Sequence, residues 1–272
     1  MASEPQPQKL PLNSNSISYQ VVRETWLTNK PDSFSSTAVG LATLLLSTGA
    51  VIYFWDLAGW AHLMPASGEQ VFEHREYWRL WTTLFAHADL AHLLSNGFLF
   101  YILGFFLYGY FGSALFPLAA FFWGGVTNYI VLKTSDPQMG LIGASGVVYW
   151  MGGAWLVLYY FLSRQKNQVQ RWLRTLGVAL LIFMPSETFD PQISYRTHAI
   201  GFALGLAAGF WHYFRNRKRY HSAERRELIE DHEDELAVEE VANAGHDDIS
   251  TAAKCCVEQN SRLVVQQLVV PL

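Results

Sequence analysis

The 272-residue sequence predicts an all-α membrane protein with a bundle of six helices and a long loop between the first two. Hydrophobic residues make up 51% of the chain and aromatic residues 15%, including ten tryptophans, which is rich for a soluble domain. The apolar residues form uncharged stretches long enough to enter a bilayer, and polar segments flank them. We therefore expect an N-terminal segment (1–33), a membrane domain (34–214) and a C-terminal tail (215–272).

Every expected span except the fifth follows from an uncharged stretch. The first is 34–55. The uncharged residues 93–132 are about twice the length of one crossing, and a turn at 108–113 divides them into a second and a third span. The remaining spans are 139–162, the short 172–185 and 197–214.

Basic residues set the expected orientation. They follow the fourth and the sixth spans: Arg164, Lys166, Arg171, Arg174, Arg215, Arg217, Lys218 and Arg219. Loops rich in Lys and Arg usually face the cytoplasm, so both termini are expected there. The long loop 56–88 and the shorter loops 133–138 and 186–196 then lie outside. His92, Asn96, Ser145 and His198 would share a shallow depth below the outer surface.

The two ends of the chain differ in charge. Residues 1–219 carry 15 Lys and Arg against 11 Asp and Glu, whereas residues 220–272 carry 4 against 12. An acidic tail on a slightly basic core argues against nucleic acid as a partner. We expect a solvated helix over 224–240 and a flexible stretch after 244. The adjacent Cys255 and Cys256 are expected to be free thiols, because neighbouring residues rarely satisfy disulfide geometry. The polar N-terminus is not typical of a cleaved signal peptide.

Ser145 is the candidate nucleophile. It lies between small residues in Gly143-Ala144-Ser145-Gly146, at the start of the fourth span. Glycines allow close backbone approach, and a helix N-terminus offers free N–H donors to a developing oxyanion. The same pattern is also common in helix packing within membranes.

His198 is the candidate base. Gly201, Gly205 and Gly209 follow it on one helical face, which allows a neighbouring helix to approach the imidazole closely. An imidazole can accept a serine proton at neutral pH. A histidine that hydrogen-bonds across a helix interface would look the same. The sequence offers no buried aspartate to orient this histidine, so a dyad is favoured over a triad.

Three more side chains complete the candidate site. His92 and Asn96 are four residues apart on one helical face, and both can donate hydrogen bonds to an oxyanion. Tyr149, one turn after Ser145, could pack against the imidazole ring, although ordinary aromatic packing is an equal alternative. A metal site at His87, His92 and His198 is disfavoured, because neither Cys nor a carboxylate lies at ligand spacing.

Together these motifs resemble the rhomboid family of intramembrane serine proteases, over about residues 37–214. The matching motifs are Gly143-Ala144-Ser145-Gly146, His198 with Gly201 and Gly205, His87-Ala88-Asp89-Leu90-Ala91-His92-Leu93-Leu94-Ser95-Asn96, and Trp78-Arg79 in the long loop. Four motifs in the family's order are far more specific than any one alone. The sequence departs from the family at Thr197, often alanine, and at Tyr108 and Tyr110, where many members carry a Glu-x-Arg pair.

The resemblance implies a mechanism, a substrate and a location. Ser145 would attack a peptide bond while His198 takes its proton. The Ser145 N–H, His92 and Asn96 would hold the oxyanion, and no cofactor would be needed. The substrate would be a transmembrane protein, cut near the outer face of the bilayer. Six spans with no extra helix favour a bacterial cytoplasmic membrane.

Two other functions fit parts of the sequence. A catalytically inactive rhomboid-like module would bind membrane helices without cutting them, but such proteins typically lack the serine or the histidine. A transporter or channel would also use polar groups inside the membrane, but the sequence has neither an inverted repeat nor a buried charge for coupling.

Overall fold

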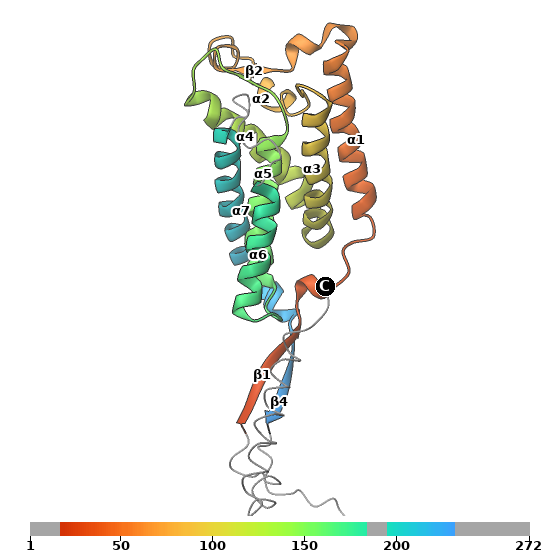
Figure 1. Ribbon diagram of the computed structural model, residues 1–272, viewed down its shortest axis with the longest axis vertical. Coiled ribbons are helices and arrows are strands. Elements are labelled where there is room, and N and C mark those ends of the chain that lie inside the picture. Colours follow the sequence, from red (N-terminus) through yellow and green to blue (C-terminus); the bar gives the residue numbers. More distant parts are fainter. Residues whose placement is uncertain (1–16, 184–194, 232–272) are drawn as a thin grey trace, which may run out of the picture. The chain divides into compact units, whose positions relative to one another are not determined.

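The computed structural model describes residues 17–183 and 195–231 of the chain (Figure 1). Its helices are α1 (Ser35–Phe54), α2 (Arg79–Thr82), α3 (Leu90–Phe111), α4 (Ala120–Lys133), α5 (Ser145–Leu162), α6 (Gln168–Phe183) and α7 (Tyr195–Ser222). Its strands are β1 (Ile17–Glu24), β2 (Ala66–Ser67), β3 (Gly140–Leu141) and β4 (Arg225–Asp231).

The predicted all-α membrane bundle is confirmed. Among the described residues, four helices are long and apolar enough to cross a membrane: Ser35–Phe54, Leu90–Phe111, Ala114–Lys133 and Ser145–Leu162. Gly112 ends α3 with a φ of 79°, at the turn expected between the second and third spans. Helices α6 and α7 occupy the places of the fifth and sixth predicted spans without meeting the same length and hydropathy criteria, so a count of six crossings stays a prediction.

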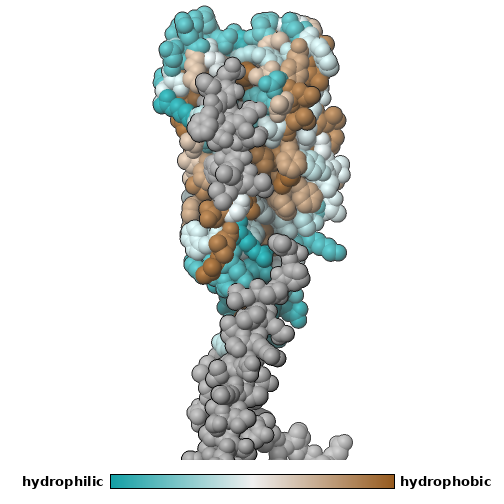
Figure 2. Space-filling view, viewed as in Figure 1, coloured by the Kyte–Doolittle hydropathy of each residue, from teal (hydrophilic) through white to brown (hydrophobic). Residues whose placement is uncertain are grey.

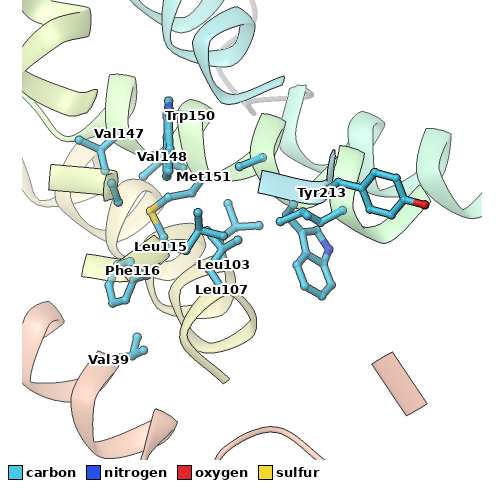
Figure 3. Packing of buried hydrophobic residues seen from close by; sticks show 14 of the residues in the cluster. Val39, Leu103, Leu107, Leu115, Phe116, Val147, Val148, Trp150, Met151 and Tyr213 are labelled. Atoms are coloured by element: carbon cyan, nitrogen blue, oxygen red, sulfur yellow. The ribbon is translucent and has the colours of Figure 1, made fainter. Parts of the chain in front are cut away.

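Helix α5 lies at the centre of the bundle. It packs against α3, α4, α6 and α7, and it is buried over most of its length. In Figure 3, Met151 of α5 lies among Leu103 and Leu107 of α3 and Leu115, which precedes α4. A helix that is apolar all round must be enclosed by other helices or lipid. Residues on α5 are therefore held in place by the rest of the bundle.

The outer helices expose apolar side chains. Leu41, Leu44 and Leu45 of α1 and Leu94 and Phe98 of α3 are all exposed. In Figure 2, hydrophobic residues gather along the side of the bundle, and hydrophilic residues gather at the upper end, where Figure 1 places β2 and α2. This distribution suits helices that face lipid along their length.

Three features differ from the sequence-based expectations. Strand β1 pairs with β4, and β2 with β3, so two small sheets accompany the helices. The expected helix over 224–240 is wrong where the structure describes it, because β4 covers Arg225–Asp231. Helix α7 continues to Ser222, past the expected end of the last span. The stretch after 244, Cys255 and Cys256 lie outside the described residues.

The chain divides into two compact units. One comprises residues 22–226 and contains helices α1 to α7; the other comprises residues 1–21 and 227–272. The expected boundaries at 34 and 214 stay predictions. All candidate site residues belong to the first unit.

Candidate active site

The loop before α5 positions Ser145. Ser145 is the first residue of the helix, and Gly143 two residues earlier has a φ of 110°. L side chains rarely adopt such a φ, so glycine is the residue suited to this turn. The first N–H groups of an α-helix have no partner within the helix. The turn therefore presents a hydroxyl beside free backbone donors.

The long loop between α1 and α3 holds this turn. Strand β2 from that loop pairs antiparallel with β3, so that Ala66 lies opposite Leu141. The Gly143 N–H donates to the Thr83 carbonyl at 3.0 Å, and the Thr83 hydroxyl donates to the Leu141 carbonyl. The segment that leads into Ser145 is thus bonded on both sides to a distant part of the sequence. Thr83 did not stand out in the sequence, because a threonine in a loop matches no motif.

The first turn of α3 brings His92 to this loop. Asp89 caps the helix by accepting the His92 N–H at 2.7 Å. The Ala88 N–H donates to His92 Nδ1 at 3.5 Å, so Nδ1 is an acceptor and the proton of the neutral ring lies on Nε2. A Cβ at Gly143 would lie 2.9 Å from His92 Nε2, so this N–H reaches the loop before Ser145.

Asn96 lies one turn further along α3 and reaches the same place. The residue is only 7% exposed, and its Nδ2 is a buried donor with no hydrogen-bond partner among the described residues. A Cβ at Gly143 would lie 3.8 Å from this Nδ2. A buried donor without an acceptor costs about 1–3 kcal/mol. The structure therefore keeps an unused hydrogen-bond donor next to the turn that carries Ser145.

Helix α7 places His198 beside the first turns of α5. The imidazole stacks on the ring of Tyr149, with centroids 4.1 Å apart and planes 8° from parallel. A Cβ at Gly201, one turn after His198, would lie 2.4 Å from the carbonyl oxygen of Gly146, the residue after Ser145, so the two backbones are in close contact beside both candidate residues. The glycines of α7 allow this close approach, as the sequence predicted. A Cβ at Gly205 would collide with the Trp150 carbonyl oxygen, and a Cβ at Gly209 would crowd the Ala154 carbonyl oxygen.

His87 is near the site but separate from it. The ring is fully buried, its centroid lies 5.0 Å from that of His92, and its Nδ1 donates to the Phe85 carbonyl at 3.2 Å. Burial lowers the pKa of His87 to about 4, which keeps the ring neutral at pH 7. Within the described ranges, no three His, Cys, Asp or Glu side chains are grouped so that they could hold a metal ion.

The Trp78-Arg79 motif organises the long loop. Arg79 is 4% exposed, pairs with Glu76 and donates to the carbonyls of His62 and Pro65, each at 2.9 Å. Trp78 is exposed. The arginine thus closes the loop that in turn holds Gly143, so its contribution to the site is indirect.

Tyr108 and Tyr110 lie where many family members carry the Glu-x-Arg pair, and this end of α3 contacts the N-terminal segment instead. The indole N–H of Trp26 donates to the Tyr110 carbonyl at 2.8 Å, and the Asp32 N–H donates to the Gly109 carbonyl at 2.9 Å. Phe34 packs near Tyr108, with ring centroids 6.4 Å apart. The end of α3 is therefore fixed by other means than a charged pair.

Comparison with known proteins agrees with the motifs. The family model of the Rhomboid domain matches residues 74–215. The chain is 29% identical over 189 residues to "Rhomboid protease GlpG" of Enterobacter sp. (strain 638), covering 66% of each protein and so just under two thirds of that relative. It is 34% identical over 126 residues to "Putative rhomboid protein L523" of Acanthamoeba polyphaga mimivirus, covering 45% of this chain and 67% of the relative.

Proposed function

Because the chain belongs to the rhomboid family, we propose that it is an intramembrane serine endopeptidase that cuts transmembrane segments with a Ser145–His198 dyad. The observation that supports this most directly is the unpaired amide of Asn96, buried beside Gly143. A hydrogen-bond donor kept free at that cost is suited to an acceptor that appears only during the reaction.

Acylation begins at the serine hydroxyl. His198 accepts the Ser145 proton as the oxygen attacks the substrate carbonyl, and a tetrahedral oxyanion forms. His198 then gives the proton to the leaving amine, which departs with one half of the substrate. Tyr149 supports this step by stacking on the imidazole, which fixes the plane of the ring. A water molecule, activated by the same histidine, hydrolyses the acyl-enzyme.

The oxyanion would be held by three donors. These are the Ser145 N–H at the helix start, the Asn96 amide and the Nε2–H of His92. The Ala88 N–H on His92 Nδ1 favours the required tautomer, because it leaves the proton on the nitrogen that faces Gly143. Loss of one such donor typically costs about 3–4 kcal/mol in the transition state.

The proposal includes a location and an orientation. The protein is an integral membrane protein, and we place it in a bacterial cytoplasmic membrane with both termini in the cytoplasm. Its substrates are transmembrane proteins, cut near the outer face. Peptide bonds inside a helix are shielded, so the cut segment must unwind, and small or helix-breaking residues there should favour cleavage.

Reconstitution with a model transmembrane substrate tests the proposal. The wild type should cleave the substrate and react with a fluorophosphonate, whereas Ser145→Ala should do neither and His198→Ala should not cleave. Ser47→Ala on α1 and the exposed His74→Ala are matched controls and should behave as wild type. A folded wild type that binds the substrate but neither cleaves it nor reacts with the probe would identify an inactive helix-binding module instead.

A further inference from the structure

A row of aromatic side chains crosses the ends of α6, α5 and α7. The ring of Trp172 on α6 lies 4.7 Å from that of Tyr160 at the end of α5. The neighbouring Phe161 lies 6.2 Å from Phe214 on α7. We call Tyr160, Phe161, Trp172, Trp211 and Phe214 the aromatic row. Trp211 is 73% exposed, Trp172 58% and Phe214 57%, so three members present large apolar surfaces outward.

Two cations follow the row on α7. Arg215 is four residues after Trp211, and Lys218 is four residues after Phe214, so all four side chains share one helical face. Both cations are exposed. Within the described residues, neither forms a hydrogen bond or an ion pair with another side chain.

Other cations at this end are used differently. Arg164 and Arg226 pair with Glu224 at 3.1 and 2.9 Å, and Arg219 lies over the Trp26 ring at 4.7 Å. Glu224 is thus already occupied by two arginines. Several neighbouring cations thus have protein partners, whereas Arg215 and Lys218 have none among the described residues and are available to a ligand.

We propose that this face of α7 binds the headgroup of an anionic phospholipid. Exposed tryptophan and phenylalanine suit the level where acyl chains meet headgroups, and long cationic side chains extend from there toward the phosphates. A guanidinium can bind a phosphate through two parallel hydrogen bonds, and an ammonium adds a point charge. The acidic residues after position 229 are an alternative source of negative charge for these cations, and the experiment below distinguishes the two.

Native mass spectrometry of the full-length protein in detergent tests the site. Phosphatidylglycerol or phosphatidylcholine is titrated in, and the fraction of protein carrying bound lipid is measured. Arg215→Gln with Lys218→Gln should weaken phosphatidylglycerol binding by about 25-fold, at about fivefold for each cation, and leave phosphatidylcholine binding unchanged. Arg75→Gln with Lys133→Gln removes the same charge at the other end of the bundle and should have no effect.

A charge-conserving variant separates the site from the fold. Arg215→Lys with Lys218→Arg should keep most of the phosphatidylglycerol binding, because the positive charge is retained. Unchanged phosphatidylglycerol binding in the neutral double variant would overturn the proposal, and it is the result expected if the chain's own acidic residues cover these cations. An equal loss in the Arg75 and Lys133 control, or an equal loss of phosphatidylcholine, would also overturn it. None of these outcomes depends on whether the protein is a protease.

Discussion

Replacement of Gly205 by alanine should disable the site without unfolding the protein. Gly205 lies on α7, two turns after His198, where the helix contacts α5. A Cβ at this position would lie 2.1 Å from the Trp150 carbonyl oxygen and 2.8 Å from its carbonyl carbon. These are backbone atoms, so no side-chain rotation can relieve the clash.

The required displacement follows from these distances. Ordinary contacts of this kind are 3.4 Å or longer, so α7 must move away from α5 by about 1.3 Å. Because α5 is enclosed by other helices, α7 is the element that can move. Its shift carries His198 away from Ser145 and Tyr149. A misplacement of about 1 Å can cost about 100-fold in rate, and we expect kcat/KM to fall by about that factor.

The assay compares Gly205→Ala with Gly40→Ala on α1, where a new Cβ meets no atom within 4 Å. Initial rates are measured on a model transmembrane substrate in liposomes, and thermal unfolding is followed on the same samples. Overpacking should lower the free energy of unfolding by about 1–3 kcal/mol. The better helix propensity of alanine partly offsets this loss, so the variant should remain folded. A folded Gly205→Ala variant whose kcat/KM lies within about threefold of wild type would refute the reasoning.

Three further predictions test Asn96 in the site and two buried residues around it. Asn96→Ala should lower kcat by about 100-fold or more with little loss of stability, since it removes an unpaired donor; an unchanged kcat would exclude an oxyanion role. Arg79→Met should lower the free energy of unfolding by about 3 kcal/mol, measured by denaturant titration, because it leaves Glu76 unpaired. His87→Phe should remove a pH dependence: the lowered pKa of about 4 makes the wild type lose about 3 kcal/mol as pH falls from 6.5 to 4, while the unfolded chain alone takes up the proton. Parallel curves for the two proteins over that range would contradict the last prediction.

The fold was largely predictable because the lipid environment makes hydropathy informative. Uncharged stretches located α1, α3, α4, α5 and the middle of α7, and Gly112 ended α3 where a turn was expected. The two small sheets were not predictable in the same way. Strands β2 and β3 have two residues each, too few for any periodicity, and they pair across more than seventy residues of sequence. The acidic stretch after Glu224 had the composition of a solvated helix, yet Arg225–Asp231 pairs with β1 as a strand.

The candidate site was predictable where it follows motifs and not where it depends on tertiary contacts. Four polar residues stand out within apolar helices: Ser145, His198, His92 and Asn96. Burying a polar group in a membrane costs free energy, so such residues usually have a function. Thr83 does not stand out, because threonine is common in loops and its bond to Leu141 exists only once the long loop has folded back. The tautomer of His92 likewise depends on a backbone N–H and cannot be inferred from a spacing.

The long loop therefore has a structural role that its sequence alone would not suggest. Gly143 needs its positive φ to bring the turn against His92, and the Thr83 carbonyl and strand β2 hold that turn from the opposite side. Arg79 binds two carbonyl groups within the loop and does not contact Gly143 itself. Its effect on Gly143 therefore passes through Thr83 and β2, which contact the segment before Ser145. It follows that weakening the loop should reduce the proposed activity by loosening the turn before Ser145, even though no side chain of the proposed dyad or oxyanion site is altered.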